Sequence, residues 1–304
     1  MSSKPTCFST KVSPSLRDKL RKDLEEQGFT FSQPPHTVFS AKKKGVHCTL
    51  YLSGSFTVQG KEKDAFIEFY LEPEILHDFS YTHPLDQMEQ RIGMGADEAG
   101  KGDYFGPIVA ASLYADSEGV KELASLGVQD SKNLSDTKVR SLSKTISKQF
   151  PHEIFCLMPP KYNELYSKFQ NLNLLLAWMH TKSIQKLYEQ CRCPKAIVDQ
   201  FAHPSVLEKF FQKEKLSIDL AQEVRAEKHV IVAAASILAR ARFLSALEEL
   251  GQPLSLKLPK GASQAVVRAG QAILHKFDTQ TLDRLSKSHF KTRSVIMDRS
   301  FPSP

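Results

Sequence analysis

The chain has 304 residues, 41% of them hydrophobic, and a formal net charge of +7. Its length allows about two domains of ordinary size, and its composition excludes a disordered or repetitive protein. No apolar run approaches the roughly 18 residues that span a bilayer, and the N-terminus lacks a signal-peptide core. The 5 cysteines have no zinc-site spacing and indicate reduced thiols in a cytoplasmic protein.

Residues 1–85 are expected to form a small α+β domain. Leucines recur every fourth residue from Leu16 to Leu24, which predicts an amphipathic helix over 14–28. Strand-like segments follow at 37–41, 46–52, 55–59 and 65–71. The next stretch, 72–90, contains two prolines and is expected to be the linker.

Residues 86–304 are expected to form a second domain in which strands and helices alternate. The predicted strands are 92–97, 107–115, 195–199 and 219–225. The predicted helices are 135–149, 171–190, 204–214 and 230–249. This alternation favours a mixed or parallel sheet with helices on its faces.

The end of strand 92–97 carries the strongest functional signal. Two adjacent carboxylates precede a lysine that stands between two glycines, namely Asp97, Glu98, Gly100, Lys101 and Gly102. Adjacent side chains on a strand point to opposite faces, so a site that uses both carboxylates requires the strand to end there. Glycines let bare backbone N–H groups approach a phosphate or sugar. We therefore predict a metal site that handles a nucleic-acid backbone, with a plain polar hairpin turn as the alternative.

Two further acids occupy positions where they could join this pair. Asp199 ends its predicted strand, and Glu227 precedes the helix 230–249. Because ligands in such folds bind at the carboxyl ends of strands, the four acids are expected to converge at one edge of the sheet. Oxygen ligands of this kind suit Mg²⁺ or Mn²⁺. Each acid also has a simpler interpretation, with Asp199 as a helix cap and Glu227 as a charge favoured by the helix dipole.

Three blocks of sequence, taken in order, resemble motifs of the type 2 ribonuclease H family. The first is Gly-Ala-Asp-Glu-Ala-Gly-Lys-Gly at 95–102, and the second is Asp-Ser-Lys at 130–132. The third is Arg-Ala-Glu-Lys at 225–228, followed by Ala-Ala-Ala-Ser-Ile-Leu-Ala-Arg at 233–240.

Several details make the chain similar to the ribonuclease HIII branch of that family. Glu227 stands where the ribonuclease HII branch usually has aspartate, and the glycine motif has lysine in place of arginine. A leading domain of 85 residues also fits the branch, whose N-terminal module resembles a TATA-binding-protein (TBP) domain and helps to hold substrate. The segments 258–263 and 288–292 are similar to late motifs of the branch.

The resemblance implies an α/β fold, with a ribonuclease H-like mixed β-sheet flanked by helices and preceded by a small α+β TBP-like domain. Residues 1–85 would be the substrate-binding TBP-like domain, and residues 86–304 the catalytic domain with a basic C-terminal segment. The implied activity is endonucleolytic hydrolysis of the RNA strand of an RNA–DNA hybrid duplex, leaving 5′-phosphate and 3′-hydroxyl ends. The implied cofactor is Mg²⁺ or Mn²⁺, and a monomer is expected.

The same resemblance implies roles for particular residues. The catalytic and metal-binding acids would be Asp97, Glu98, Asp199 and Glu227, with Asp97 as the shared ligand. The substrate-binding residues would be Gly100, Lys101, Gly102, Ser131 and Lys132. The backbone of the glycine motif would sense the 2′-hydroxyl, and the Asp-Ser-Lys block would contact phosphate. No histidine falls in a block that we can assign.

The sequence leaves two other functions open. One is excision of single ribonucleotides from DNA, as in the ribonuclease HII branch, and the other is a non-catalytic hybrid-binding module. The last 54 residues hold nine basic and three acidic side chains, a net charge of +6. Such a segment suits a polyanionic partner, although a merely solvated basic face would have the same composition.

Overall fold

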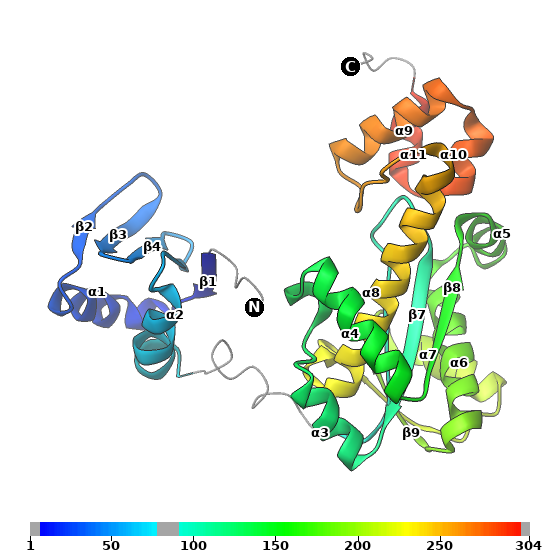
Figure 1. The fold of residues 1–304 in the computed structure, drawn as a ribbon, viewed down its shortest axis with the longest axis horizontal. Helices are drawn as coiled ribbons and strands as arrows, with labels where there is room; N and C mark the ends of the chain where they lie inside the picture. The colour runs from blue at the N-terminus through cyan, green and yellow to red at the C-terminus, as the bar shows by residue number, and fades with distance from the viewer. Residues whose placement is uncertain (1–6, 78–90, 299–304) are drawn as a thin grey trace. The chain divides into compact units, whose positions relative to one another are not determined.

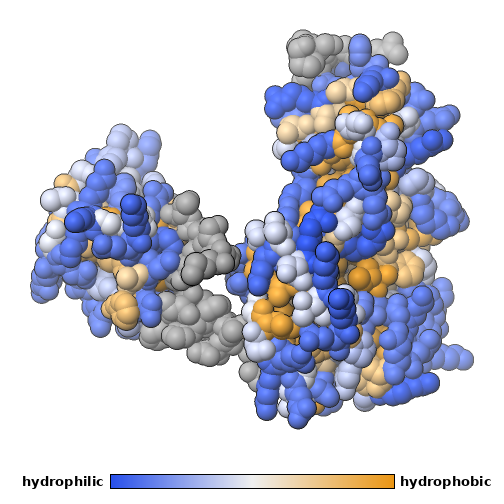
Figure 2. All heavy atoms as spheres, in the orientation of Figure 1, coloured by the Kyte–Doolittle hydropathy of each residue, from blue (hydrophilic) through white to orange (hydrophobic). Residues whose placement is uncertain are grey.

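The computed structural model describes residues 7–77 and 91–298, and the chain divides into two compact units, Met1–Gln87 and Met88–Pro304 (Figure 1). Each unit has hydrophobic clusters of its own. On the face seen in Figure 2 the surface is mostly hydrophilic, because the large apolar side chains are gathered in these clusters.

The first unit is a five-stranded antiparallel sheet with helices. The strand order is β1-β5-β4-β3-β2. The strands are β1 (Cys7–Lys11), β2 (Thr30–Ser32), β3 (Thr37–Lys43), β4 (Val46–Tyr51) and β5 (Ser55–Gln59). The helices are η1 (Pro14–Leu16), α1 (Arg17–Glu26), α2 (Lys63–Phe66) and the π-helix η2 (Ile67–Leu76).

The prediction of a strand at 65–71 is wrong, because these residues are helical in α2 and η2. Aromatic residues favoured the strand, yet the buried residues Ile67, Leu71 and Ile75 recur every fourth position, which is a helical spacing. The helix continues through Pro73 to Leu76 and so takes up the first part of the predicted linker. The rest of that linker, from residue 78, lies outside the described residues.

The second unit is built on a mixed five-stranded sheet, as predicted, with strand order β10-β9-β6-β7-β8. The strands are β6 (Gly93–Ala99), β7 (Ile108–Ala115), β8 (His152–Leu157), β9 (Lys195–Asp199) and β10 (Asp219–Glu223). β6, β7 and β8 pair antiparallel, whereas β6, β9 and β10 pair parallel. The predicted strand 219–225 ends early, because Arg225 adopts a left-handed conformation with φ 57°.

Helices cover both faces of this sheet. They are α3 (Ser117–Ser125), η3 (Ser131–Asn133), α4 (Asp136–Gln149), α5 (Pro159–Phe169), α6 (Leu172–Cys191), α7 (Pro204–Lys213), η4 (Ala226–Lys228), α8 (Val230–Gly251), η5 (Gln252–Leu254), α9 (Gln264–Lys276), α10 (Thr279–Leu285) and α11 (Lys291–Met297). α6 packs beside alternate residues of β6 and β7, and α8 packs on the opposite face. β1, β2, β8, α3, α5 and α9–α11 were not predicted from the sequence.

α8 is the central helix of the second unit (Figure 1). The stretch Val230–Leu254 is long and apolar enough to cross a membrane, but 83% of its most apolar 18-residue window is buried inside the unit, so it serves as a core helix. Its backbone lies against β6 at Gly95, where an added Cβ would be 2.6 Å from the carbonyl oxygen of Ile231 and 2.6 Å from the nitrogen of Val232. Only glycine permits this approach.

We expect Gly95→Ala to lower the free energy of unfolding of the second unit by about 2–3 kcal/mol, because the methyl group would push backbone against backbone. The corresponding fall in Tm, measured by calorimetry, is roughly 4–10 °C. Gly102→Ala is the matched control, since a Cβ at Gly102 meets nothing within 4 Å. Equal Tm values for the two variants would show that α8 does not depend on this contact.

Candidate active site

The acid pair lies where β6 has lost one of its two neighbours. β6 pairs with β7 as far as Ala99, but its pairing with β9 stops at Ala96. We expected the strand to end at the acids. This is wrong for the pairing with β7, which continues past them, and it holds only for the pairing with β9. Because β9 stops first, side chains from both faces of β6 can reach the space beyond it.

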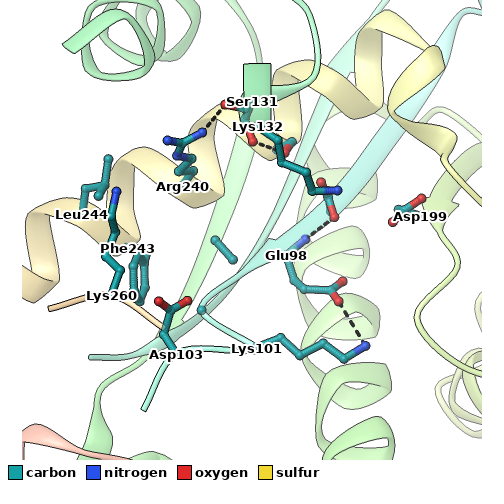
Figure 3. Close-up of a pocket in the computed structure, with 15 residues that line it drawn as sticks. Glu98, Lys101, Asp103, Ser131, Lys132, Asp199, Arg240, Phe243, Leu244 and Lys260 are labelled. Carbon is teal, nitrogen blue, oxygen red and sulfur yellow. Dashed lines mark hydrogen bonds and ion pairs between the residues drawn. The ribbon is translucent and has the colours of Figure 1, made fainter. Parts of the chain in front are cut away.

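The two carboxylates point to opposite faces of the sheet, as alternation requires. Asp97 is on the face of Gly95, toward α8, and Glu98 is on the other face, toward α6. Both nevertheless line one cavity of about 520 Å³. Figure 3 shows Glu98 and Asp199 at one end of this cavity and Arg240 and Lys260 at the other.

Asp97 is buried, with 9% of its surface exposed. Burial, together with the negative charges of Glu98 and Asp199, raises the pKa of its carboxyl group to about 8. The Glu98 backbone N–H, 2.7 Å from Asp97 Oδ1, lowers this pKa in part. A cation placed beside Asp97 would relieve the repulsion.

Asp199 and Glu227 are brought together by the left-handed turn at Arg225. The backbone N–H of Ala226 donates to Asp199 Oδ1 at 2.8 Å, so Asp199 caps this turn and not α7, whose cap is His203. Burial and the charge of Glu227, opposed in part by the Ala226 N–H, raise the pKa of Asp199 to about 6.

Glu227 does not itself line the cavity but is joined to it through Lys132, whose Nζ lies 3.2 Å from Glu227 Oε1. Its pKa is lowered: burial acts to raise it, but its own backbone N–H and the Lys132 ammonium outweigh that effect. The second oxygen, Oε2, is buried and has no hydrogen-bond partner within residues 7–77 and 91–298. A buried carboxylate oxygen without a partner fits a bound cation.

The acids suit a hard divalent cation by their chemistry. Within residues 7–77 and 91–298, no three acidic, histidine or cysteine side chains stand close enough to form a ready-made metal cage. The set offers oxygen donors only, neighbouring acids help to raise the pKa values of Asp97 and Asp199, and Glu227 Oε2 is unpartnered among the described residues. Mg²⁺ or Mn²⁺ fits these residues, and binding would draw the carboxylates together.

The turn at 100–103 follows the acids directly. Gly100 has φ +88°, and a Cβ there would meet the carbonyl oxygen of Pro107 and, at 2.9 Å, the ring of Phe243, so glycine is required. Gly102 is open. The Lys101 side chain folds back, with its Nζ 3.6 Å from Glu98 Oε1 and 3.3 Å from the Phe201 carbonyl oxygen.

Ser131 and Lys132 of the Asp-Ser-Lys block line the same cavity. Asp130 accepts the backbone N–H of Lys132 at 2.9 Å and so begins η3. The hydroxyl of Ser131 is buried against that of Ser236, 2.8 Å away. Lys132 is the exposed member, with 74% of its side chain accessible.

Two basic residues brace this block. The guanidinium of Arg240 donates to the Ser131 carbonyl and, at 2.7 Å, to Asp136 Oδ1. Lys260 donates to the other oxygen of Asp136 at 2.8 Å. Arg240 thus holds Ser131 directly, and Lys260 holds Asp136, the other acceptor of Arg240.

A histidine that was not expected from the sequence lies at the site, His180 on α6. Its Nε2 lies 3.0 Å from Glu98 Oε2, and its ring stacks on Phe201 with centroids 5.1 Å apart. His180 is fully buried, and no hydrogen-bond partner for its Nδ1 is found among the described residues. The available signal was a polar residue within the apolar stripe of the predicted helix 171–190.

Comparisons with known proteins agree in pointing to one family. A family model described as Ribonuclease HII matches residues 94–293, and one described as a Domain of unknown function (DUF3378) matches residues 8–82. A Ribonuclease HIII from Protochlamydia amoebophila (strain UWE25) is 46% identical over 98% of this chain and 99% of its own length.

Solved structures give the same result. The crystal structure of Bst-RNase HIII in complex with Mn²⁺ matches with a TM-score of 0.65 and 29% identity, covering 95% of this chain and 97% of that one. The crystal structure of Aquifex aeolicus RNase H3 matches with a TM-score of 0.55 and 29% identity, covering 92% of this chain and 98% of that one.

We expect Asp97→Asn to raise the Tm of the protein in EDTA, because it removes a buried charge from a negative cluster. The raised pKa of Asp97 means that the folded state disfavours its charged form, so the wild type loses stability as the pH rises from about 4 toward 8. The gain from the substitution should therefore be larger at pH 8 than at pH 5. Mn²⁺ should raise the Tm of the wild type more than that of the variant, and a variant less stable than the wild type at pH 8 in EDTA would contradict this account.

His180→Phe should weaken Mn²⁺ binding roughly tenfold, as measured by calorimetric titration, because Glu98 would lose the N–H that orients it. The phenyl ring can keep the stacking on Phe201. His152→Gln is the control, since His152 lies on β8 and bonds the Phe150 carbonyl oxygen. An unchanged affinity in His180→Phe would mean that Glu98 is oriented by other contacts.

Proposed function

The chain belongs to the type 2 ribonuclease H family, in its ribonuclease HIII branch, and we infer from this that it is an endonuclease acting on the RNA strand of RNA–DNA hybrids. It is a divalent-metal-dependent hydrolase that leaves 5′-phosphate and 3′-hydroxyl ends. The observation that carries the inference is one cavity that is lined by Asp97, Glu98 and Asp199 and by the turn with the open Gly102.

We assign the metal-holding role to Asp97, Glu98, Asp199 and Glu227. Bound divalent ions supply an activated water and stabilise the leaving 3′ oxygen of the phosphodiester. Asp97 stands between the negative charges of Glu98 and Asp199, which supports its role as the shared ligand. Glu227 offers an unpartnered buried oxygen, and His180 and the Ala226 N–H hold Glu98 and Asp199 in place.

The residues around the acids provide contacts for the strand. The 2′-hydroxyl distinguishes RNA from DNA, and we propose that the turn of Gly100, Lys101 and Gly102 senses it, because the open Gly102 lets a sugar approach the backbone. Lys132 is proposed to contact phosphate, which fixes the register of the strand. Ser131 helps to hold the neighbouring Lys132 in place, because its buried hydroxyl is hydrogen-bonded to that of Ser236.

The remaining parts of the chain are assigned as follows. Residues 1–85 are proposed to be a substrate-binding TBP-like domain and residues 86–304 the catalytic domain, whose C-terminal positive charge suits a polyanionic partner. A monomer in the cytoplasm is also proposed. Five free cysteines, Cys7, Cys48, Cys156, Cys191 and Cys193, support a reducing compartment.

The test is cleavage of three labelled duplexes with Mg²⁺ or Mn²⁺: an RNA–DNA hybrid, a DNA duplex with one ribonucleotide, and an all-DNA duplex. We expect internal cuts in the RNA strand of the hybrid and none in the all-DNA duplex. Equally efficient cutting at the lone ribonucleotide would favour the ribonuclease HII-type activity. Tight binding of the hybrid without cleavage would favour a non-catalytic binding module.

Two glutamates four positions apart give a matched pair of variants for this assay. Glu227→Gln should lower kcat on the hybrid more than roughly 100-fold, beyond the loss typical of residues that only support a metal ligand. Glu223→Gln should stay within a few-fold of the wild type, because the Glu223 carboxylate is engaged by Lys228 and His229. The reverse order of effects would transfer the fourth metal-binding role from Glu227 to Glu223.

A further inference from the structure

The loop at residues 100–106 is gripped by a buried lysine from the C-terminal part of the chain. Lys287 is fully buried, and its Nζ donates to the carbonyl oxygens of Asp103 and Gly106, each at 2.7 Å. The rings of Tyr162 and Phe290 lie 5.8 Å and 6.0 Å from the same nitrogen. Two carbonyls and two aromatic faces thus surround the ammonium group.

An ion pair does not explain the burial of Lys287. In the described part of the chain, no carboxylate lies within ion-pair distance of its Nζ, and the Asp103 carboxylate instead accepts the N–H of Gly261 at 2.6 Å. Burial lowers the pKa of Lys287 to about 7, against the opposing charges of Asp103 and Cys156. An apolar side chain would fill this space at a lower desolvation cost. The structure therefore depends on the N–H donors of Lys287 rather than on its volume.

The backbone around Lys287 pairs with the loop as well. The N–H of Lys287 donates to the Tyr104 carbonyl oxygen, and the N–H of Gly106 donates to that of Leu285, each at 2.9 Å. Phe105 and Ser286 form an isolated antiparallel bridge between them. Residues 285–287 therefore act as a short strand beside the loop.

The contacts of Lys287 with the loop also constrain the glycine turn, through Asp103. The N–H of Asp103 donates to the carbonyl oxygen of Gly100 at 3.3 Å, which closes the turn. The carbonyl of Asp103 is bound by Lys287, and its carboxylate by Gly261. β6 holds the residues that lead into the turn, and these two contacts at Asp103 hold the end of the turn.

We propose that Lys287 is a positioning residue, which holds the turn 100–103 in the conformation that receives the ribose-phosphate strand. The proposal rests on the function inferred above, since it takes that turn as the reader of the strand. Without the N–H donors, the turn would have to become ordered when substrate binds, and binding would be weaker. The four acids are held by other contacts, so metal binding would be unaffected.

The test compares Lys287→Met with the wild type. Methionine keeps an unbranched apolar stem and removes every donor. We expect KM for the hybrid to rise about tenfold, kcat to change less than threefold, and the Kd for Mn²⁺ to stay the same. Hydrogen exchange of the amides in residues 99–107 should become faster, while exchange in β8 should not change.

Ile296→Ala is the control, because Ile296 on α11 is buried and packs against Gly270 of α9. It should lower Tm without raising KM. If Lys287→Met does not fold, Lys287→Gln takes its place, with a neutral head one bond too short to bind both carbonyls and an expected intermediate KM.

A folded variant with wild-type KM and wild-type exchange in residues 99–107 would overturn the proposal. Failure of the wild type itself to cleave the hybrid would instead overturn the proposed function. The exchange measurement needs no substrate, so the two failures are distinguishable.

Discussion

The close approach of α8 to β6 at Gly95 is the contact on which the site depends. With no side chain between them, the helix backbone lies directly on the strand, two residues before Asp97. Asp97 shares the face of Gly95, so it points toward α8 and is buried there beside Ser236. Ser236 in turn bonds Ser131, and through it α8 fixes the Asp-Ser-Lys block. The contact between α8 and Gly95 thus determines how deeply Asp97 is buried and where Lys132 lies.

The site contains repulsion between negative charges, which the rest of the second unit must offset. Asp97 and Asp199 have raised pKa values because they are buried near other negative charges. Lys132 and Lys101 offset only part of this charge, and both stand at the rim of the cavity. Clusters of this kind lower the stability of a fold, but the same repulsion between carboxylates favours binding of a cation. The buried apolar side chains around α8 and the sheet stabilise the unit and offset this repulsion.

The sequence predicted those features that repeat locally and missed those that depend on distant contacts. Mixed strand pairing and the core helix α8 followed from period and composition. The helix at 63–76 was mistaken for a strand because its aromatic content outweighed a four-residue spacing of buried positions. His180 contacts Glu98 across 82 positions, and Lys287 contacts Asp103 across 184, so neither partnership leaves a mark in the nearby sequence. The acid pair was identified, but its geometry depends on where β9 stops, which is a property of the sheet.

The pairing of residues 285–287 with the loop has a consequence for the order in which the site is made. A chain grows from its N-terminus, so all five strands of the second unit, the four acids and α8 are synthesised before Lys287. The acids and the sheet can therefore assemble while the loop at 100–106 still lacks its support, and that loop must wait for a partner about 180 residues further along the chain. During translation, the residues proposed to hold metal are therefore complete before the residue proposed to support the loop that receives the sugar strand.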